Sequence, residues 1–332
     1  MKLLSKLHKQ LTVNAPKRIL IVKTSSLGDL IHNFPMVSDI RAQFPNCKID
    51  WLVEETYIPL VKLHPGVERI IPVALRRWRT SIFLSLTWKE IKDCIFEVRK
   101  RRYDLVIDSQ GLIKSAVFAL LAKGLTCGFG PRYSRERLAG MSYGLRMSVS
   151  REQHMLDRCR QLASLALNYQ LAEKPDYGLI KQNYSALEKN NVVIFCSSAQ
   201  SKKLWPSTDW IRICDYLSSR NFNCQFTWGS PDEQAACKHI ISSSAGELLP
   251  KMPIDNLATL VAQSCMVIGL DTGLLHLAAA LEVPSIAVFG ASDPLKTGPQ
   301  GNGTIKICGS KNRFPTAEEV ESTITAVIEM IN

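Results

Sequence analysis

Two strand–turn–helix segments carry the residues best suited to chemistry, and the clearer one lies in the second half of the chain. The apolar run Met266–Leu270 leads directly into Asp271, Thr272 and Gly273. Glycine lets the backbone approach a ligand closely, and the unpaired amides of a following helix favour phosphate. Thr272 adds a hydroxyl donor, whereas Asp271 either caps the helix or accepts a hydrogen bond from a sugar. His276, about one turn further on, suits the same site or a structural role.

The corresponding segment of the first half ends in a carboxylate. The run Arg18–Val22 continues into Lys23–Asp29, which reads Lys-Thr-Ser-Ser-Leu-Gly-Asp. This loop lacks the spacing of a Walker A motif and the three glycines of the dinucleotide-binding motif. A carboxylate at the end of such a loop is a candidate general base. Asp29 therefore either removes a proton from a substrate or caps the next helix.

Two further segments of the second half could hold a nucleotide. Ser198 and Lys203 follow the apolar run Val192–Cys196, and a lysine with a nearby hydroxyl can bind a diphosphate. Glu233 follows another strand-like run, and its carboxylate could bind ribose hydroxyls. Alternatively, Glu233 occupies the first turn of a helix that begins at Pro231.

Basic residues dominate the first half. Residues 1–160 contain 28 Lys and Arg against 14 Asp and Glu, whereas residues 161–332 contain 13 against 16. The densest cluster is Arg76-Arg77-Trp78-Arg79, and arginine binds carboxylates and phosphates through two parallel hydrogen bonds. Further basic residues are Lys114, Arg132, Arg135 and Arg137. One compact cluster does not follow a nucleic-acid strand, so we expect an anionic partner other than nucleic acid.

Length and composition are typical of a globular protein with two domains. The chain has 332 residues, of which 46% are hydrophobic and 21% charged. Its ten cysteines include no Cys-x-x-Cys pair, so we expect a reduced cytoplasmic protein without a disulfide framework or zinc site. The apolar run Ala116–Ala122 is far shorter than the roughly 20 residues that span a bilayer. We expect no signal peptide, and we interpret residues 1–16 as a basic leader.

The candidate residues must be positioned by strands and helices that alternate along the chain. Apolar strand-like runs occur at 18–22, 48–53, 69–72, 105–108 and 126–129, and again at 192–196, 223–228, 266–270, 285–289 and 304–308. Amphipathic segments such as 88–102 and 209–219 separate them, which predicts parallel sheets built from strand–helix–strand units. We therefore expect an α/β fold with two doubly wound domains, followed by a capped helix at 316–330.

The order and spacing of the motifs resemble the lipopolysaccharide heptosyltransferase I family over nearly all of residues 17–330. The resemblance rests on Arg18–Asp29, Asp50–Glu55, Arg76–Arg79, Val106–Ser115 and Asp271–Leu277. It implies a GT-B fold, in which two Rossmann-like, doubly wound parallel-sheet domains face each other across a cleft. The implied boundaries are a leader at 1–16, an N-terminal acceptor domain at 17–170, a linker at 171–190, a C-terminal donor domain at 191–315, and a helix at 316–332 that packs back on the acceptor domain.

The resemblance also implies a reaction. Family members transfer L-glycero-D-manno-heptose from ADP-heptose to the inner Kdo of Kdo2-lipid A, with inversion and without a metal or cofactor, and Asp29 matches their general base. The implied donor residues are Ser198, Lys203, Glu233, Met252, Asp271, Thr272, Gly273 and His276. We expect acceptor contacts from Ser26, Gly28, Arg76, Arg77, Arg79, Gln110, Lys114 and Arg135. One departure is Ser198-Ala199, which stands where the family often has two threonines.

The resemblance implies a phosphorylated, carboxylated lipid acceptor and an enzyme peripheral to the cytoplasmic face of the inner membrane, and the basic first half suits such a lipid. The arginines at 76–79 could contact either the acceptor or the membrane alone. Three alternatives stay open. The enzyme that adds the second heptose is disfavoured by Lys23–Ser26 and Thr272, and a nucleotide-dependent dehydrogenase by the missing glycine motif. A non-catalytic binder of anionic lipid would use the first half alone.

Overall fold

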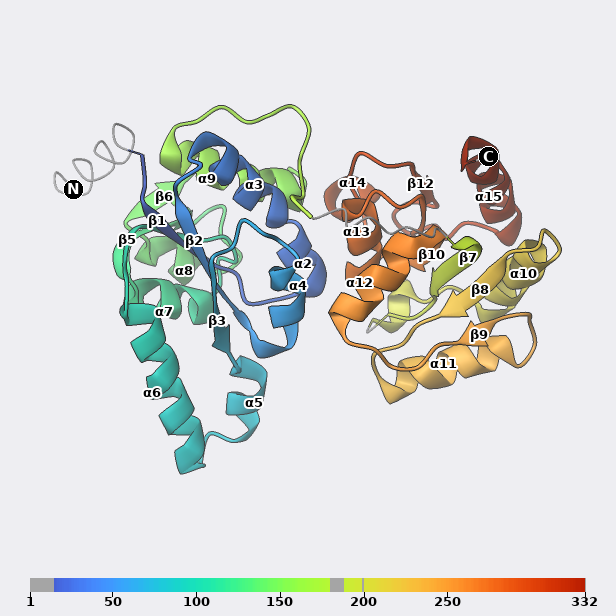
Figure 1. Cartoon of the computed structure of the whole chain (residues 1–332), viewed down its shortest axis with the longest axis horizontal. Helices are drawn as coiled ribbons and strands as arrows, with labels where there is room; N and C mark the ends of the chain where they lie inside the picture. The colour runs from blue at the N-terminus through green and yellow to red at the C-terminus, as the bar shows by residue number, and fades with distance from the viewer. Residues whose placement is uncertain (1–14, 180–187, 199, 332) are drawn as a thin grey trace. The chain divides into compact units, whose positions relative to one another are not determined.

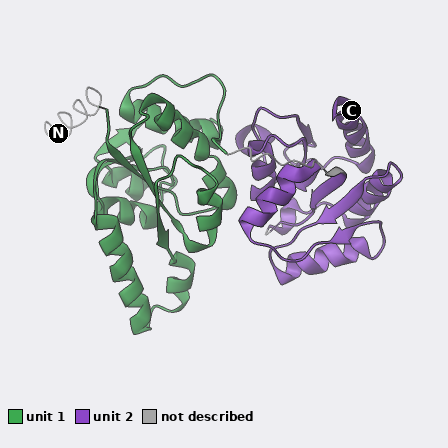
Figure 2. Ribbon diagram, viewed as in Figure 1, with its two compact units in different colours: residues 1–180 green, residues 181–332 purple. Residues whose placement is uncertain are grey.

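The computed structural model describes residues 15–179, 188–198 and 200–331. The chain forms two compact units, residues 1–180 and 181–332, which Figure 2 distinguishes by colour. The division falls inside the expected linker at 171–190. Residues 1–14 of the expected leader, and Ala199 beside the expected donor residue Ser198, lie outside the described residues.

The first unit is a parallel sheet of six strands in the order β3-β2-β1-β4-β5-β6, with helices packed on it (Figure 1). The strands are β1 (Arg18–Val22), β2 (Lys48–Glu54), β3 (Arg69–Val73), β4 (Arg102–Asp108), β5 (Lys123–Phe129) and β6 (Leu145–Met147). The helices are α2 (Leu27–Ile31), α3 (Phe34–Gln43), the short 3-10 helix η1 (Glu55–Tyr57), α4 (Ile58–Lys62), α5 (Leu75–Thr80), α6 (Ser85–Arg99), α7 (Ile113–Leu121), α8 (Arg137–Ser142) and α9 (Met155–Leu167).

The second unit repeats this architecture, with a parallel sheet of six strands in the order β12-β11-β10-β7-β8-β9. The strands are β7 (Glu188–Phe195), β8 (Asn223–Phe226), β9 (Glu247–Leu248), β10 (Ser264–Leu270), β11 (Ser285–Val288) and β12 (Ile305–Cys308). The helices are the 3-10 helix η2 (Ser201–Lys203), α10 (Ser207–Ser218), α11 (Pro231–Ile241), α12 (Ile254–Gln263), α13 (Gly273–Ala280), α14 (Pro294–Thr297) and α15 (Ala317–Ile331).

Both sheets have the doubly wound strand order, in which successive strands are added first on one side of the first strand and then on its other side. This switch point lies between β1 and β4 in the first unit and between β7 and β10 in the second. In register, Val22 of β1 lies beside Asp108 of β4, and Gly269 of β10 lies beside Phe195 of β7. The loops that follow these central strands therefore begin next to each other, where open α/β sheets bind ligands.

The predicted α/β class and its parallel strands are confirmed. The central strands are buried on both faces, which explains why runs such as Ile19–Val22 are continuously apolar rather than alternating. The sequence did not predict the edge strands β6 and β9, which have only three and two residues. Strands this short carry too little periodicity to be recognised.

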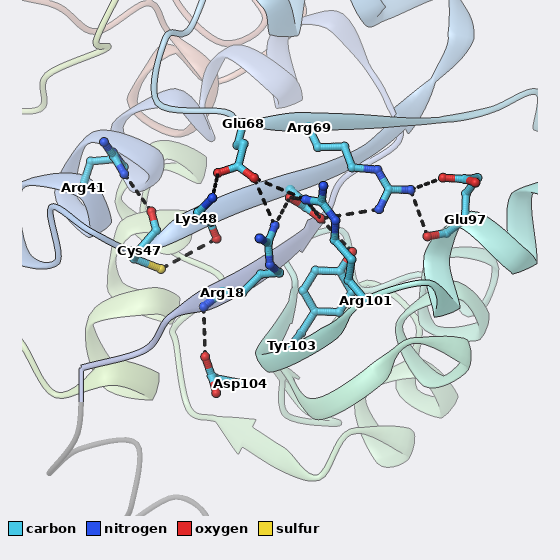
Figure 3. A network of polar contacts seen from close by, with 11 residues as sticks. Arg18, Arg41, Cys47, Lys48, Glu68, Arg69, Glu97, Arg101, Tyr103 and Asp104 are labelled. Atoms are coloured by element: carbon cyan, nitrogen blue, oxygen red, sulfur yellow. Dashed lines mark hydrogen bonds and ion pairs between the residues drawn. The ribbon is translucent and has the colours of Figure 1, made fainter.

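A network of ion pairs surrounds the fully buried Asp50 at the amino edge of the first sheet (Figure 3). Arg18 Nη1 lies 3.1 Å from Asp50 Oδ1, and the Tyr103 hydroxyl donates to Oδ2 at 2.9 Å. Arg69 and Arg101 also pair with this carboxylate. The network joins the amino ends of four strands. Some of the basic residues of the first unit therefore stabilise the amino edge of the sheet, which is opposite the carboxyl edge where the switch-point loops begin.

The C-terminal helix α15 begins with the predicted cap. Thr316 Oγ1 accepts a hydrogen bond from the Glu319 amide at 3.3 Å, and Glu319 Oε2 accepts one from the Thr316 amide at 2.9 Å. The buried face of the helix, including Val320 and Ile324, joins the core of the second unit with α10. Its expected packing on the first unit stays a prediction.

Candidate active site

The loops after β1 and β4 meet at the switch point of the first unit. The backbone amide and the hydroxyl of Thr24 both donate to Gln110 Oε1 at 2.8 Å. Lys23 Nζ donates to the carbonyl oxygen of Ser109 at 3.3 Å, and its side chain is fully buried. The two loops thus form one hydrogen-bonded unit at the carboxyl edge of the sheet.

Asp29 lies on α2 beside these loops, and two basic side chains contact its carboxylate. Arg135 Nη2 donates to Oδ1 at 2.9 Å and to Oδ2 at 3.2 Å, while Lys23 Nζ lies 3.6 Å from Oδ1. Burial by itself would raise the pKa of Asp29, but the charges of Lys23, Arg135 and His32 outweigh that effect and hold the pKa well below its ordinary value. Asp29 is therefore an ionised carboxylate at neutral pH.

The same carboxylate also caps helix α2. Asp29 Oδ2 accepts hydrogen bonds from the Ser26 amide at 3.3 Å and from the Ser26 hydroxyl at 3.2 Å. Gly28 is buried within this short helix. The capping role that the sequence left open for Asp29 is therefore confirmed, and it leaves Oδ1 facing the two cations.

A buried carboxylate holds Gln110 in position. Asp108 Oδ1, at the end of β4, accepts from the amides of Gln110 at 2.9 Å and Gly111 at 3.2 Å. Its Oδ2 accepts from the Tyr143 hydroxyl at 2.7 Å. Burial raises the pKa of Asp108, although these hydrogen bonds act in the opposite direction. Gly111 has a positive φ of 67°, so this turn suits glycine.

Two members of the arginine cluster after β3 bind groups of their own unit. The Arg77 guanidinium bridges two carboxylates, with Nη2 3.1 Å from Glu55 Oε2 and Nη1 2.8 Å from Glu90 Oε2. Arg76 Nη2 donates to the Tyr57 hydroxyl at 3.1 Å. Arg77 is thus already paired, and binding an acceptor would require it to exchange a partner.

Three other expected acceptor residues keep their charge more available. Arg79 and Lys114 are exposed, and neither forms an ion pair within the described part of the chain. The Arg135 side chain is 41% exposed despite its contact with Asp29. These three cations are the ones best placed to meet an anionic ligand.

The second unit also brings its strand ends together. Lys203, after β7, donates from Nζ to Asp271 Oδ2 at 2.6 Å and to the Asp271 carbonyl oxygen at 3.2 Å. The hydroxyl of Ser292, after β11, donates to the same carboxylate. Three strand ends therefore converge on Asp271, which follows β10.

Helix α13 begins beside this ion pair. Thr272 is its N-cap residue and Gly273 its first residue. The Thr272 hydroxyl oxygen is buried and has no hydrogen-bond partner among the described residues. His276 is buried within the helix. The unpaired amides, the helix dipole and the adjacent lysine favour an anion at this end of the helix.

The remaining expected donor residues lie on neighbouring segments. Ser198 Oγ accepts from the Gln200 amide at 3.3 Å. Glu233 Oε2 accepts from the Gly229 amide at 2.7 Å, and this residue completes the capping box of α11. Met252 packs on an apolar cluster of the second unit. The first-turn position that the sequence left open for Glu233 is confirmed, whereas its contact with a ribose stays a prediction.

Three residues of these sites were not among the site residues expected from the sequence, although Lys23 and Thr24 belong to the loop that was recognised there. Lys23 and Thr24 follow β1, and Ser292 follows β11. The available signal was the position of Lys23 and Thr24 directly after a buried strand at the switch point, a signal that Ser292 lacks. Thr24 contacts a residue 86 positions away in the chain, and Ser292 contacts one 21 positions away. The local sequence therefore gives no indication of these contacts.

Two other features of the described residues concern metals and membranes. No group of three or more His, Cys, Asp or Glu side chains there is arranged to hold a metal ion. No helix in the described ranges combines the length and the apolar character needed to cross a membrane.

Comparison with known proteins identifies a consistent set of relatives. The family profile of glycosyltransferase family 9 (heptosyltransferase) matches residues 93–325. Lipopolysaccharide heptosyltransferase 1 of Escherichia coli (strain K12) is 34% identical over 321 residues, which cover 95% of this chain and 99% of that protein. The enzyme of the same name from Pseudomonas aeruginosa is 35% identical, covering 93% of this chain and 87% of its own length.

Solved structures give the same result. E. coli heptosyltransferase WaaC with ADP superposes with a TM-score of 0.84 at 32% identity, covering 95% of this chain and 100% of that one. WaaC has also been solved with ADP-2-deoxy-2-fluoro heptose, with a TM-score of 0.83 at 33% identity, covering 93% and 99% of the two chains. E. coli ADP-heptose lps heptosyltransferase II has a TM-score of 0.77 at 19% identity, covering 95% and 99%, which indicates a shared fold.

Proposed function

Because this chain belongs to glycosyltransferase family 9, the heptosyltransferases, and is a glycosyltransferase with the two-domain GT-B fold, we propose that it adds the first heptose of the lipopolysaccharide inner core. The donor is ADP-L-glycero-D-manno-heptose, the acceptor is the inner Kdo of Kdo2-lipid A, and the anomeric carbon is inverted. The observation that carries the proposal is the ionised Asp29 at a switch point, in a chain whose relatives at 33–35% identity are named lipopolysaccharide heptosyltransferase 1.

The second unit binds the donor in this proposal. Lys203 has three N–H donors, so it can keep its bond to Asp271 and still reach a diphosphate. The buried Thr272 hydroxyl and the first amides of α13 supply further donors. The structures of WaaC with ADP and with a fluorinated ADP-heptose support a nucleotide-sugar donor. Further donor contacts come from Ser198, Glu233, Met252, Gly273 and His276.

The first unit binds the acceptor and supplies the base. Arg135 is exposed enough to bind a carboxylate or phosphate of the acceptor. Such binding would weaken its hold on Asp29 and raise the pKa of that carboxylate toward its ordinary value, which makes Asp29 a stronger base when the acceptor is present. Further acceptor contacts come from Ser26, Gly28, Arg76, Arg77, Arg79, Gln110 and Lys114.

The reaction follows from these roles. A Kdo hydroxyl oxygen attacks the anomeric carbon while Asp29 takes its proton, and the bond from that carbon to ADP breaks. Lys203 and the helix amides receive the negative charge that develops on ADP, so protein groups do the work that a metal does in other transferases. Closure of the two domains would bring donor and acceptor together. The enzyme acts as a peripheral protein at the cytoplasmic face of the inner membrane.

Addition of the second heptose is the nearest alternative, and two observations disfavour it. The solved heptosyltransferase II is 19% identical to this chain, against 34% for heptosyltransferase 1 of the same species. The Lys23–Ser26 segment and Thr272 also depart from the sequence expected of a heptosyltransferase II.

The test uses purified protein, ADP-heptose and two acceptors, namely Kdo2-lipid A and Kdo2-lipid A that already carries one heptose. We expect mass spectrometry to show a gain of one heptose on the first acceptor, with and without EDTA. Gain only on the second acceptor would indicate addition of the second heptose. Donor binding without any transfer would indicate a non-catalytic binder, and activity lost in EDTA but restored by Mg²⁺ would contradict the metal-free mechanism.

A further inference from the structure

Large apolar side chains are exposed along one short segment of the first unit, which comprises the turn after α5 and the start of α6. Phe83 is 98% exposed, Leu86 60%, Leu84 59%, Trp88 50% and Ile82 44%. We call these five residues the apolar tip. Single exposed apolar residues are ordinary on a protein surface, but five within seven positions are an unusual concentration of apolar groups in contact with water.

The apolar tip lies at the same edge of the sheet as Asp29. Helix α5 follows the carboxyl end of β3, and α6 runs back along the sheet, so the turn between them lies beyond the carboxyl ends of the strands. Figure 1 shows this turn projecting away from the sheet of the first unit. Arg77 of α5 forms an ion pair with Glu55, which directly follows the carboxyl end of β2, so α5 lies at the carboxyl edge of the sheet. The tip and the proposed base therefore belong to one side of this unit.

Exposed basic side chains lie near the apolar tip in the sequence. Arg79, Lys89 and Lys92 are exposed on α5 and α6. On α6, Trp88, Lys92 and Phe96 follow one another at intervals of four residues, so they share one outer face of the helix, and Phe96 is 65% exposed. Tryptophan with lysine beside exposed apolar groups is the composition that lies at a membrane–water interface.

We propose that the apolar tip inserts into the headgroup region of an anionic lipid bilayer. The inference deepens the proposed function, on which it rests for its purpose, because a lipid acceptor is presented at a membrane. Charge favours this occupant over a second copy of the chain. Bringing two tips together would juxtapose the basic surfaces of two first units, whereas anionic lipid complements them.

Co-sedimentation with lipid vesicles tests the proposal without donor or acceptor. We expect the full-length protein to bind vesicles of phosphatidylcholine mixed with phosphatidylglycerol, and to bind pure phosphatidylcholine much less. Salt should weaken the binding. The double variant Phe83→Ser/Leu86→Ser should bind the mixed vesicles at least about tenfold more weakly, since each buried apolar side chain contributes about tenfold or more. The matched control is Leu295→Ser, because Leu295 is 84% exposed on the second unit, and it should bind like the wild type.

Trp88 provides a direct reading of insertion. Of the six tryptophans it is the exposed one, since the other five are buried or partly buried. We expect mixed vesicles to shift tryptophan emission to shorter wavelength. The Trp88→Phe variant should keep the binding, because Phe is also apolar, and lose the shift.

Several outcomes would overturn the proposal. These are wild-type binding that does not depend on anionic lipid, equal losses in the tip variant and in Leu295→Ser, or a tip variant that changes only the oligomeric state. The tip variant should also transfer heptose to detergent-dispersed acceptor at the wild-type rate, and a matching loss there would assign the tip to acceptor recognition instead. Failure of the proposed reaction itself would appear as no transfer by the wild type, while vesicle binding stayed intact.

Discussion

The carboxylate of Asp29 caps helix α2 through one oxygen and faces two cations with the other. Lys23 and Arg135 keep it ionised, so it is ready to accept a proton although its free-state basicity is low. A base of this kind gains strength only when a ligand draws a cation away from it. The residue thus links acceptor binding to catalysis in the proposed mechanism.

We expect Asp29→Ala and Asp29→Asn to lose at least about 100-fold in the rate of transfer, the usual contribution of a general base. Asn is the sharper variant, because its amide oxygen can still accept the Ser26 hydrogen bonds of the cap. Donor affinity, measured by calorimetry with ADP, should not change, because the proposed donor residues lie in the second unit. Near-normal turnover by a folded Asp29→Asn protein would remove this residue from the mechanism.

Arg135→Ala should change the pH dependence of the reaction. Arg135 lowers the pKa of Asp29, so its removal raises that pKa. Because the base must be ionised, the acidic limb of kcat/KM for the acceptor, which reports the free enzyme in which Arg135 contacts Asp29, should move to higher pH. Arg137→Ala is the matched control, since Arg137 is also exposed and basic but does not contact Asp29 in the described part of the chain. Identical pH profiles for the two variants would contradict the role of Arg135.

Lys203→Ala should weaken ADP binding by about 10- to 100-fold, because hydrogen bonds to charged groups contribute about 1.5–3 kcal/mol. The loss also leaves Asp271 without its lysine partner beside the bound diphosphate. Lys202→Ala removes the same charge from the exposed neighbouring position and should have little effect. Equal affinities for the two variants would place the diphosphate elsewhere.

At the scale of elements, helix ends serve two purposes in this chain. The N-terminus of α13 leaves amides and the Thr272 hydroxyl for a ligand, whereas the N-terminus of α15 is closed by the side chains of Thr316 and Glu319. A capped end stabilises the helix, and an uncapped end beside a lysine is available for an anion. The difference is consistent with a structural role for α15 and a binding role for α13.

Thr316→Ala should lower the free energy of unfolding of the protein by about 1 kcal/mol, the typical contribution of an N-cap. Thr316→Ser keeps the hydroxyl that accepts from the Glu319 amide and should lose much less. Urea denaturation of both variants measures the difference. Equal losses for the two variants would show that the methyl group, which both lack, supports the helix rather than the cap.

At the scale of the whole molecule, charge and binding chemistry are divided between the units. Residues 1–160 carry an excess of 14 positive charges and residues 161–332 an excess of 3 negative charges, as follows from 28 against 14 and 13 against 16. The basic unit contains the proposed base and the apolar tip. The other unit contains the helix end suited to a nucleotide diphosphate, so each unit matches one of the two proposed substrates.

Hydrogen exchange in the presence of ADP tests this division. We expect slower exchange of amides at 196–203 and 271–276, and little change around residues 23–29. The same pattern should appear in Asp29→Asn, because that variant retains the donor residues. Protection centred on residues 23–29 would instead assign the nucleotide to the first unit.

The sequence by itself determined the α/β class, ten of the twelve strands found in the described residues and the turns that begin α2 and α13. These features depend on local periodicity, turn chemistry and caps, which act over a few residues. Their positions after strand-like runs already singled out Asp29 and Asp271, and the family resemblance added the substrates on which they are expected to act.

Only the tertiary structure decided which side chains meet. Arg135 reaches Asp29 from 106 residues away, and Lys203 reaches Asp271 from 68 residues away. Arg77 had the same local signal as Arg79 but is bound by Glu55 and Glu90, which leaves Arg79 as the more available cation. The physical reason is that strand order and register bring distant loops to one edge of a sheet, and short sequence windows contain no record of that arrangement.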